Sequence, residues 1–278
     1  MHPEKIGFPP PLLGEAPERL QVFRWSADDG LLILEKPAGV LVDPHPWYPA
    51  SPSLVAALAR QVDAAKPELA PFGFERVHGV GVIDAEIEGA ALIAANHQAG
   101  ARWRDAYGSG QVEWVFECVA RSFESPQKAL GKKGGTIESA HAFECRLPLV
   151  GDPKQARTRV SHRFGKQART RFQRLEPLSN EGGWSLWKAR TSYHRPHQLR
   201  LHALESGLRI AGESLYLPDS SETDPTSKPN AEPGGPLMRL SEIVATPAGE
   251  RPGVHCQVPA SKAWLRRVKA LTTRNATL

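Results

Sequence analysis

The fold is decided by the run L-L-I-L-E-K-P-A-G-V-L-V, residues 31–42, which predicts two short apolar strands joined at Lys36-Pro37-Ala38-Gly39. Proline ends a strand, and glycine permits the tight turn that follows it. Similar short runs predict further strands, at residues 89–95, 112–120, 141–149, 169–175, 184–192 and 254–258.

Helices are predicted where the composition and spacing of apolar residues favour them, at residues 53–62, 103–109, 198–206 and 261–271. Ser53 is placed to cap the first helix, and Gly207 follows the third, where helices often end. Many short strands with few helices between them predict an α+β fold with a mostly antiparallel mixed sheet and flanking helices. The chain has no G-x-G-x-x-G motif and no P-loop, so nothing in it indicates nucleotide-cofactor chemistry.

The domain organisation follows from length and composition. The 278 residues are 40% hydrophobic, which is enough for a substantial core. We predict a proline-rich tail or surface strap at residues 1–21 and a single domain at residues 22–278. Residues 218–236 lack large apolar side chains and are predicted to be a flexible insertion within that domain.

The composition also narrows the compartment. No run approaches the roughly 18 apolar residues of a membrane span, and prolines stand where a secretory signal would be apolar. Cys118, Cys145 and Cys256 form no C-x-x-C pair, which favours a reducing compartment without a disulfide framework or a zinc site. We therefore expect a cytoplasmic protein without membrane, metal or cofactor, and a monomer by default.

The net charge of +5 is modest, but its distribution is uneven. Residues 154–174 carry eight basic side chains and no acidic one. Arg157 with Arg159, and Arg169 with Arg171, alternate with other residues at strand spacing, so each pair should project from one face of a strand. A solvated charged face is the simpler interpretation, but so concentrated a basic surface is typical of nucleic-acid binding.

Asp84 is the polar residue that stands out, in G-V-G-V-I-D-A-E-I-E-G. It follows an apolar run and should lie at the mouth of a buried strand, although an ordinary turn aspartate would fit the same pattern. Glu86 and Glu88 are expected to face solvent. Arg200, within a half-apolar segment, needs an anionic partner, and we predict a buried ion pair with Asp84.

Four segments, in order, resemble the pseudouridine synthases that act on large-subunit rRNA and tRNA. The run 31–42 resembles the family's opening strands with their K-P-A-G turn, and residues 165–170 resemble its G-K-x-A-x-T segment. Residues 194–202, H-R-P-H-Q-L-R-L-H, are similar to G-R-x-H-Q-I/L-R-x-H, and residues 207–216 to G-H-P-I-x-G-D-x-x-Y. Asp84 matches the aspartate of the family's H-R-L-D-R motif, whereas Val82 and Ala85 stand where it has arginines.

The resemblance implies the fold of the pseudouridine synthase catalytic core and the isomerisation of uridine to its C-linked isomer. The uridine would be flipped out of its RNA, with Asp84 acting as nucleophile or general base. Arg200 would orient Asp84, and Phe116, at the position of a family tyrosine, would stack on the base. The catalytic residues predicted are thus Asp84, Arg200 and Phe116; the RNA-binding residues predicted are Lys36, Arg157, Arg159, Lys166, Arg169, Arg171, Arg195 and His197.

Three hypotheses fit these residues. The first is an active synthase that modifies rRNA or tRNA without a cofactor, and the second is an inactive relative that binds structured RNA through the same basic groove. The third is a DNA-binding or ribosome-surface module without a ligand pocket. The survival of Asp84, Arg200 and an aromatic residue at Phe116 favours the first.

Overall fold

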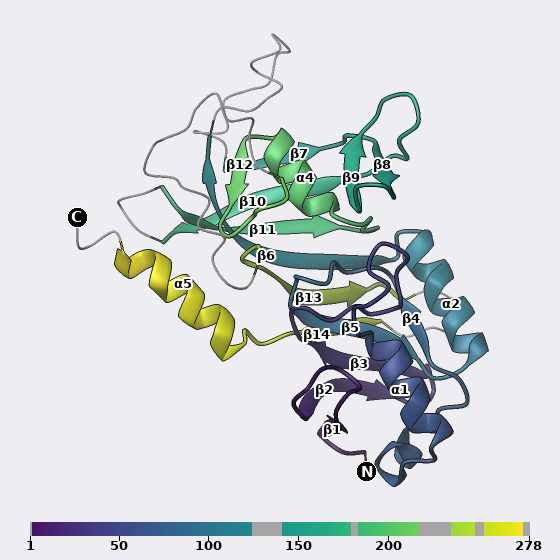
Figure 1. The fold of residues 1–278 in the computed structure, drawn as a ribbon. Coiled ribbons are helices and arrows are strands. Elements are labelled where there is room, and N and C mark those ends of the chain that lie inside the picture. The colour runs from purple at the N-terminus through teal and green to yellow at the C-terminus, as the bar shows by residue number, and fades with distance from the viewer. Residues whose placement is uncertain (1, 124–140, 179–182, 217–234, 248–252, 275–278) are drawn as a thin grey trace.

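The computed structural model describes residues 2–123, 141–178, 183–216, 235–247 and 253–274. They form an α+β fold in which all named strand pairs are antiparallel (Figure 1). This confirms the predicted fold class. Most of the predicted insertion, residues 218–234, lies outside the described residues.

A five-stranded sheet with the order β1-β2-β3-β5-β4 occupies the N-terminal part of the chain. Its strands are β1 (Lys5–Phe8), β2 (Glu18–Ser26), β3 (Leu31–Lys36), β4 (His78–Val80) and β5 (Gly89–Ala94). Two helices and a 3₁₀ segment accompany it: α1 (Leu54–Asp63), η1 (Pro67–Phe72) and α2 (His97–Gly108). Ser53 caps α1 as predicted, accepting a hydrogen bond from the N–H of Ala56.

A seven-stranded sheet follows, with the order β14-β13-β6-β11-β10-β7 and with β12 paired to β6. Its strands are β6 (Val112–Ser122), β7 (Ala142–Cys145), β10 (Thr170–Pro177), β11 (Ser185–Thr191), β12 (Leu208–Ile210), β13 (Met238–Ala245) and β14 (Val254–Gln257). A separate hairpin pairs β8 (Leu149–Asp152) with β9 (Arg157–Val160). The remaining helices are α4 (Gln198–Glu205) and α5 (Lys262–Arg274).

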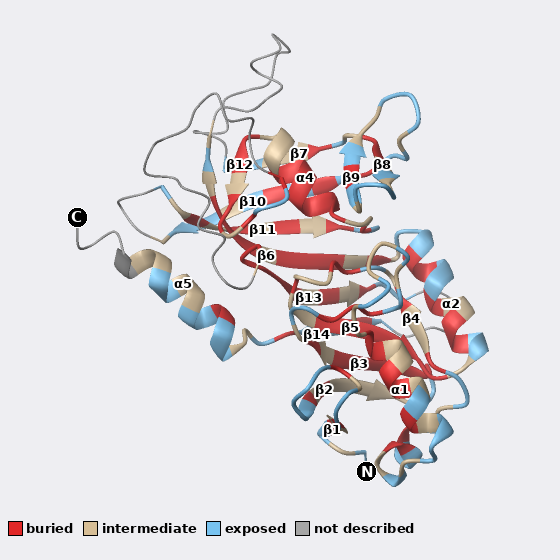
Figure 2. Ribbon diagram, viewed as in Figure 1, coloured by how far each residue is buried: buried red, intermediate tan, exposed pale blue. Residues whose placement is uncertain are grey.

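The two sheets meet where β5 approaches β13. The N–H of Leu240 donates to the carbonyl of Glu88 at 2.8 Å. Gly89 has φ 139° there, and a Cβ on it would lie 2.5 Å from the Leu240 carbonyl, so only glycine fits. One buried apolar cluster consequently extends through both sheets, as the red strands β3, β5 and β6 of Figure 2 show. The loop that carries Asp84 lies beside this junction.

Three predictions about the elements were wrong. Residues 1–21 are not a tail, because β1 and the start of β2 form the edge of the five-stranded sheet and bury Ile6 and Phe8. A strand of four residues among prolines is too short to give a periodic signal. After Gly39 no second strand forms, since Leu41 makes only an isolated bridge to Ser53. The strand predicted at 141–149 is interrupted at Pro148, between β7 and β8.

Candidate active site around Asp84

The loop between β4 and β5 carries Asp84 and is held by Lys36 at the end of β3. The Lys36 ammonium donates to the carbonyls of Ile87, Ala85 and Pro37 at 2.6, 3.1 and 3.3 Å. Burial lowers the pKa of Lys36 to about 7, although nearby acidic groups oppose this. The predicted RNA-binding role of Lys36 is therefore wrong: its side chain is buried and its donors are committed to the Asp84 loop.

Asp84 lies in the loop after β4, a strand that is only partly buried, and Asp84 itself is only 5% exposed. Its Oδ1 accepts a hydrogen bond from the backbone N–H of His197 at 2.9 Å, whereas its buried Oδ2 has no hydrogen-bond partner among the described residues. Burial alone would raise the pKa of Asp84. The side chains of His197, His194 and Arg200, with the His197 N–H, outweigh burial and hold this pKa below its ordinary value. Asp84 is thus an ionised carboxylate in which Oδ1 is held by a hydrogen bond and the buried Oδ2 is available to a ligand.

His197 stands directly before α4, in the left-handed region with φ 56°. Its Nδ1 lies 2.9 Å from the Tyr216 hydroxyl, and its Nε2 lies 3.1 Å from the Tyr48 hydroxyl. His197 was predicted to bind RNA, but its ring is not placed to contact RNA directly. Its side chain is buried, and both ring nitrogens are held by tyrosines while its backbone binds Asp84.

Arg200 does not form the predicted ion pair with Asp84. It donates from Nε and Nη2 to the two carboxylate oxygens of Glu213 at 2.6 and 2.8 Å. Glu213 takes Arg200 because its carboxylate matches the planar guanidinium fork with two parallel hydrogen bonds. Glu86, expected in solvent, is only about one-third exposed, and its Oε2 lies 3.4 Å from Arg200 Nη1. Arg200 acts on Asp84 only through its longer-range positive charge.

Phe116 does not present the open face that stacking on a base requires. It is fully buried on β6, with the Trp114 ring 6.3 Å away and the His194 ring 5.3 Å away, centroid to centroid. His194 is the group between this strand and the Asp84 loop, since its Nδ1 lies 2.8 Å from the Val82 carbonyl. The Val82 side chain is 39% exposed.

Sequence reasoning missed four residues that shape this site: Tyr48, Tyr107, Glu213 and Tyr216. Glu213 and Tyr216 fall within the fourth family-like segment, so that match carried a signal. Tyr107 and Tyr48 carried none, because their hydroxyls reach the site from α2 and from the segment after β3. Such contacts between segments far apart in sequence leave no local pattern.

The predicted RNA-binding arginines fall into two groups. Arg157 and Arg159 are exposed on β9, and Lys166 is exposed after the hairpin. Arg169 and Arg171 instead bind the carboxylate of Glu144, together with Arg146. Hydrogen bonds from Arg169, Arg146 and Arg171 lower the pKa of Glu144 to about 2. Because one carboxylate pairs with three guanidinium groups, the cluster has a net charge of +2.

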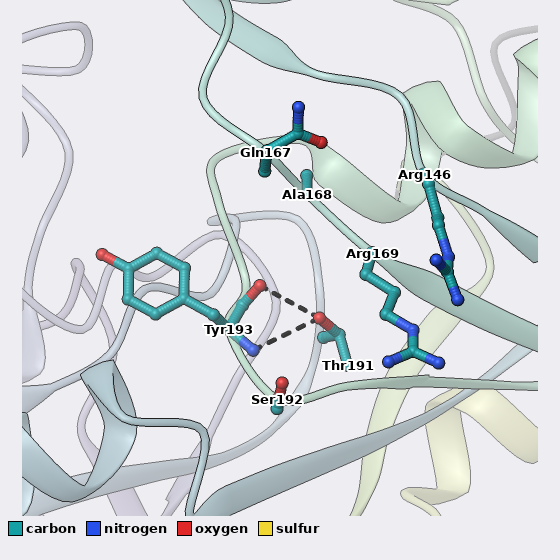
Figure 3. Close-up of a pocket in the computed structure, with 7 residues that line it drawn as sticks. All are labelled: Arg146, Gln167, Ala168, Arg169, Thr191, Ser192 and Tyr193. Carbon is teal, nitrogen blue, oxygen red and sulfur yellow. Dashed lines mark hydrogen bonds between the residues drawn. The ribbon is translucent and has the colours of Figure 1, made fainter.

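A cavity of about 300 Å³ lies beside that cluster, lined by Arg146, Gln167, Ala168, Arg169, Thr191, Ser192 and Tyr193. Figure 3 shows the Arg146 and Arg169 guanidiniums extending to one side of it while the Tyr193 ring points to the other. The Thr191 hydroxyl donates to the Tyr193 carbonyl at 3.0 Å and fixes the backbone there. Arg195 donates to the Gln167 carbonyl and lies over the Tyr193 ring, so it spans the edge of the cavity.

The described residues hold no group of three side chains placed to bind a metal ion. Within the same ranges, every helix is too short or too polar to cross a membrane. The three cysteines are free and buried.

The buried His202 of α4 gives the fold a specific pH dependence. Its ring bonds to the Thr170 hydroxyl at 2.9 Å and to the Leu147 carbonyl at 3.0 Å, and burial lowers its pKa to about 4. The unfolded chain takes up this proton near pH 6.5 and the folded protein only near pH 4. His202 therefore removes stability as the pH falls through that window, by up to about 3 kcal/mol.

We expect His202→Gln to lose less stability than the wild type between pH 6.5 and 4, because glutamine is polar but takes up no proton. Urea unfolding at several pH values in this window measures the difference. His255→Gln, at a side chain that is 59% exposed, is the control and should follow the wild type. If the free energy of unfolding changed with pH equally in the wild type and in His202→Gln, His202 would not be the group that causes the loss of stability at acid pH.

Comparison with known proteins identifies the family. A family model described as RNA pseudouridylate synthase matches residues 30–205. An uncharacterized RNA pseudouridine synthase of Chloroflexus aurantiacus is 27% identical over 188 residues, covering 67% of this chain and 52% of that protein. The dual-specificity RNA pseudouridine synthase RluA of Escherichia coli is 26% identical over 190 residues, covering 68% of this chain and 74% of that protein.

Among solved structures, human RNA Pseudouridylate Synthase Domain Containing 4 shares the fold, with a TM-score of 0.61 and 15% identity over 90% of this chain and 92% of that one. The chain spans between 52% and 62% of the length of three of the curated relatives that it matches. The family match covers more than half of the chain and includes the Asp84 loop and all of α4. The protein therefore belongs to the RNA pseudouridylate synthase family.

Proposed function

We propose that the protein isomerises specific uridines of rRNA or tRNA to pseudouridine, with Asp84 as the essential residue. The observation that carries this proposal is the state of the Asp84 carboxylate. It is buried, its Oδ1 is fixed by the His197 N–H, and its Oδ2 has no hydrogen-bond partner in the part of the chain that the structure describes. A charged oxygen left open in a buried site needs a ligand to compensate its desolvation, and a flipped nucleotide would supply one.

The arrangement supports two roles for Asp84, as nucleophile toward the ribose or as general base, and in both Oδ2 is the reacting atom. The low pKa of Asp84 keeps it charged at neutral pH. Lys36 holds the loop by its backbone carbonyls, and His197 orients the carboxylate. Preorganisation of this kind lowers the cost of reaching the reactive geometry.

Access to Asp84 requires a local movement, because the site is closed. The segment after β3 reaches across to His197 through Tyr48, whose hydroxyl also lies 3.2 Å from the Ala156 carbonyl on the β8–β9 hairpin. The neighbouring Trp47 ring meets the His197 ring edge-on at 5.8 Å. We infer that the extruded nucleotide displaces these contacts, at a cost of a few kcal/mol together with the lost base stacking.

The RNA itself would be held by exposed basic groups at the rim. Arg157, Arg159 and Lys166 belong to or follow the β8–β9 hairpin, which also contacts the site through Ala156. The cluster of Arg146, Arg169 and Arg171 on Glu144 offers further positive charge. These groups would bind phosphates and so set position without reading bases. A substrate of this class also favours a cytoplasmic protein.

We expect the double variant Arg157→Ala, Arg159→Ala to bind RNA more weakly and with a smaller salt dependence. The slope of log affinity against log salt should fall by about 1 for each lost phosphate contact. Filter binding or fluorescence anisotropy between about 50 and 200 mM salt measures this slope. Arg60→Ala, at an exposed position of α1, is the matched control, and a double variant with the same slope as that control would exclude the hairpin from the RNA surface.

An inactive, RNA-binding relative is the second candidate function. Val82 and Ala85 in place of arginines favour it, as does the fully buried Phe116, which leaves no aromatic face for the base. Incubating the protein with total rRNA and tRNA from a strain lacking its gene, and then mapping pseudouridines, separates the two. New pseudouridines at defined positions are expected; their absence from every RNA would support the binding function and end the catalytic proposal.

A further inference from the structure

One ring nitrogen of His194 forms a hydrogen bond within the protein, and the other forms none among the described residues. Its Nδ1 lies 2.8 Å from the Val82 carbonyl, and because a carbonyl only accepts, Nδ1 carries the proton. In the neutral ring, Nε2 is then a bare lone pair. This nitrogen is buried and has no partner among the described residues, which is a costly state unless a ligand occupies it.

The pose of His194 is fixed from three sides. The Tyr107 hydroxyl accepts from the His194 N–H at 2.6 Å and lies 2.8 Å from the His194 carbonyl, so α2 holds the backbone. The Phe116 ring packs on the imidazole at 5.3 Å. The ionisable groups that interact with the ring are Asp84 on its loop and His202 on α4, whereas Tyr107 contacts only the backbone of His194. Burial lowers the pKa of His194 against the opposing charge of Asp84, so the neutral form prevails at pH 7.

The proposed reaction needs a proton acceptor. The bond between C1′ and N1 breaks, a bond between C1′ and C5 forms, C5 loses its hydrogen, and N1 gains one. Several other groups near Asp84 are already engaged, and His45, which also interacts with the charge of Asp84 and accepts from the Trp47 N–H through Nδ1, is more exposed than His194. His197 has both nitrogens on tyrosine hydroxyls, Lys36 has its donors on carbonyls, and Phe116 has no hydroxyl.

We propose that His194 is a catalytic residue, whose Nε2 accepts the C5 proton once C1′ is attached to C5. This inference rests on the proposed function. The electron pair of the C5–H bond then forms the C5=C6 double bond, the pair of the N1=C6 bond moves to N1, and the imidazolium returns its proton to N1, directly or relayed through a water molecule. The ring ends neutral, as it began, and no other reactant is needed.

His194→Gln tests this assignment, because its amide can still donate to the Val82 carbonyl but cannot take up a proton. We expect single-turnover pseudouridine formation to fall at least about a hundredfold, with RNA affinity within about twofold of the wild type. The rate of the wild type should fall at acid pH as His194 is protonated, and this dependence should be lost in the variant. RNA with deuterium at C5 should show a larger isotope effect in the variant, because loss of that hydrogen becomes the slow step.

Imidazole added to His194→Gly supplies a second readout that a structural role would not give. We expect imidazole to restore part of the rate of His194→Gly and none of the rate of Asp84→Asn. His255→Gln, at an exposed side chain of β14, should behave as the wild type throughout. If His194→Gly does not fold, as thermal melting would show, His194→Gln and the pH dependence decide.

Two outcomes would overturn the assignment. The first is a wild-type rate in His194→Gln. The second is a rate of His194→Gly above that of the wild type without imidazole, which would show that the ring only blocks Phe116. Both require an active wild type. A wild type that modifies no RNA would instead remove the proposed function, and this inference with it.

Discussion

Asp84→Asn is expected to lower the rate of pseudouridine formation at least about a thousandfold, the scale expected for removal of an essential nucleophile or base. Asparagine keeps the oxygen that accepts from the His197 N–H, so the loop should remain in place. The change removes only the charge and reactivity of Oδ2. Single-turnover assays on an RNA that the wild type modifies measure the effect.

Two controls separate chemistry from folding and binding in that experiment. RNA affinity should stay within about twofold, because Asp84 is buried and phosphate contacts are made by exposed arginines. Thermal melting should show that the variant is folded but somewhat less stable than the wild type, because the lowered pKa of Asp84 means that the folded protein stabilises the charged carboxylate. Asp28→Asn, at an exposed position before β3, should leave the rate unchanged. A rate for Asp84→Asn within tenfold of the wild type would exclude Asp84 as the catalyst.

Glu213→Gln is expected to reduce the free energy of unfolding by about 3–5 kcal/mol, because it leaves the Arg200 guanidinium buried without its main partner. Both side chains are at most 4% exposed, and they share two hydrogen bonds. Glu213 also accepts from the N–H of Tyr216, whose hydroxyl meets His197. The variant should therefore lose activity as well as stability.

Urea unfolding of Glu213→Gln, Arg200→Met and the double variant measures this pair. The double variant should cost less than the sum of the two single changes, because neither partner is then left alone. Glu113→Gln breaks a pair with Arg190 in which both side chains are at least one-third exposed, and it should cost less than about 1 kcal/mol. Equal costs for Glu213→Gln and Glu113→Gln would contradict the buried pair.

Patterns confined to one segment predicted their structures well. Alternation and apolar runs located β6, β10 and β11, and the serine at 53 located the start of α1. Asp84 was placed beyond the end of a strand because an apolar run precedes it. The α+β class followed from the number of strands, and the hairpin arginines on β9 are exposed as their spacing indicated.

The partners of the charged residues could not be predicted in the same way. The sequence places both Asp84 and Glu213 as acidic candidates to pair with Arg200. Only the fold determines that the Arg200 guanidinium binds Glu213. The sequence suggests that Lys36 is a surface cation, but its ammonium donates hydrogen bonds to three backbone carbonyls. Every residue has a backbone carbonyl, so the sequence cannot show which carbonyls will surround a lysine. Glu144 neutralises part of a run that appears purely basic, because β7 pairs with β10 across a long separation.

The most direct test of the central claim is a pseudouridine map of all rRNA and tRNA in a strain lacking the gene, carrying either the wild type or Asp84→Asn. Both proteins should be present at equal amounts, as immunoblotting would verify. We predict that the wild type restores pseudouridine at one or a few defined uridines and that Asp84→Asn restores none of them. Restoration of the same positions by both proteins would contradict a reaction that depends on the Asp84 carboxylate.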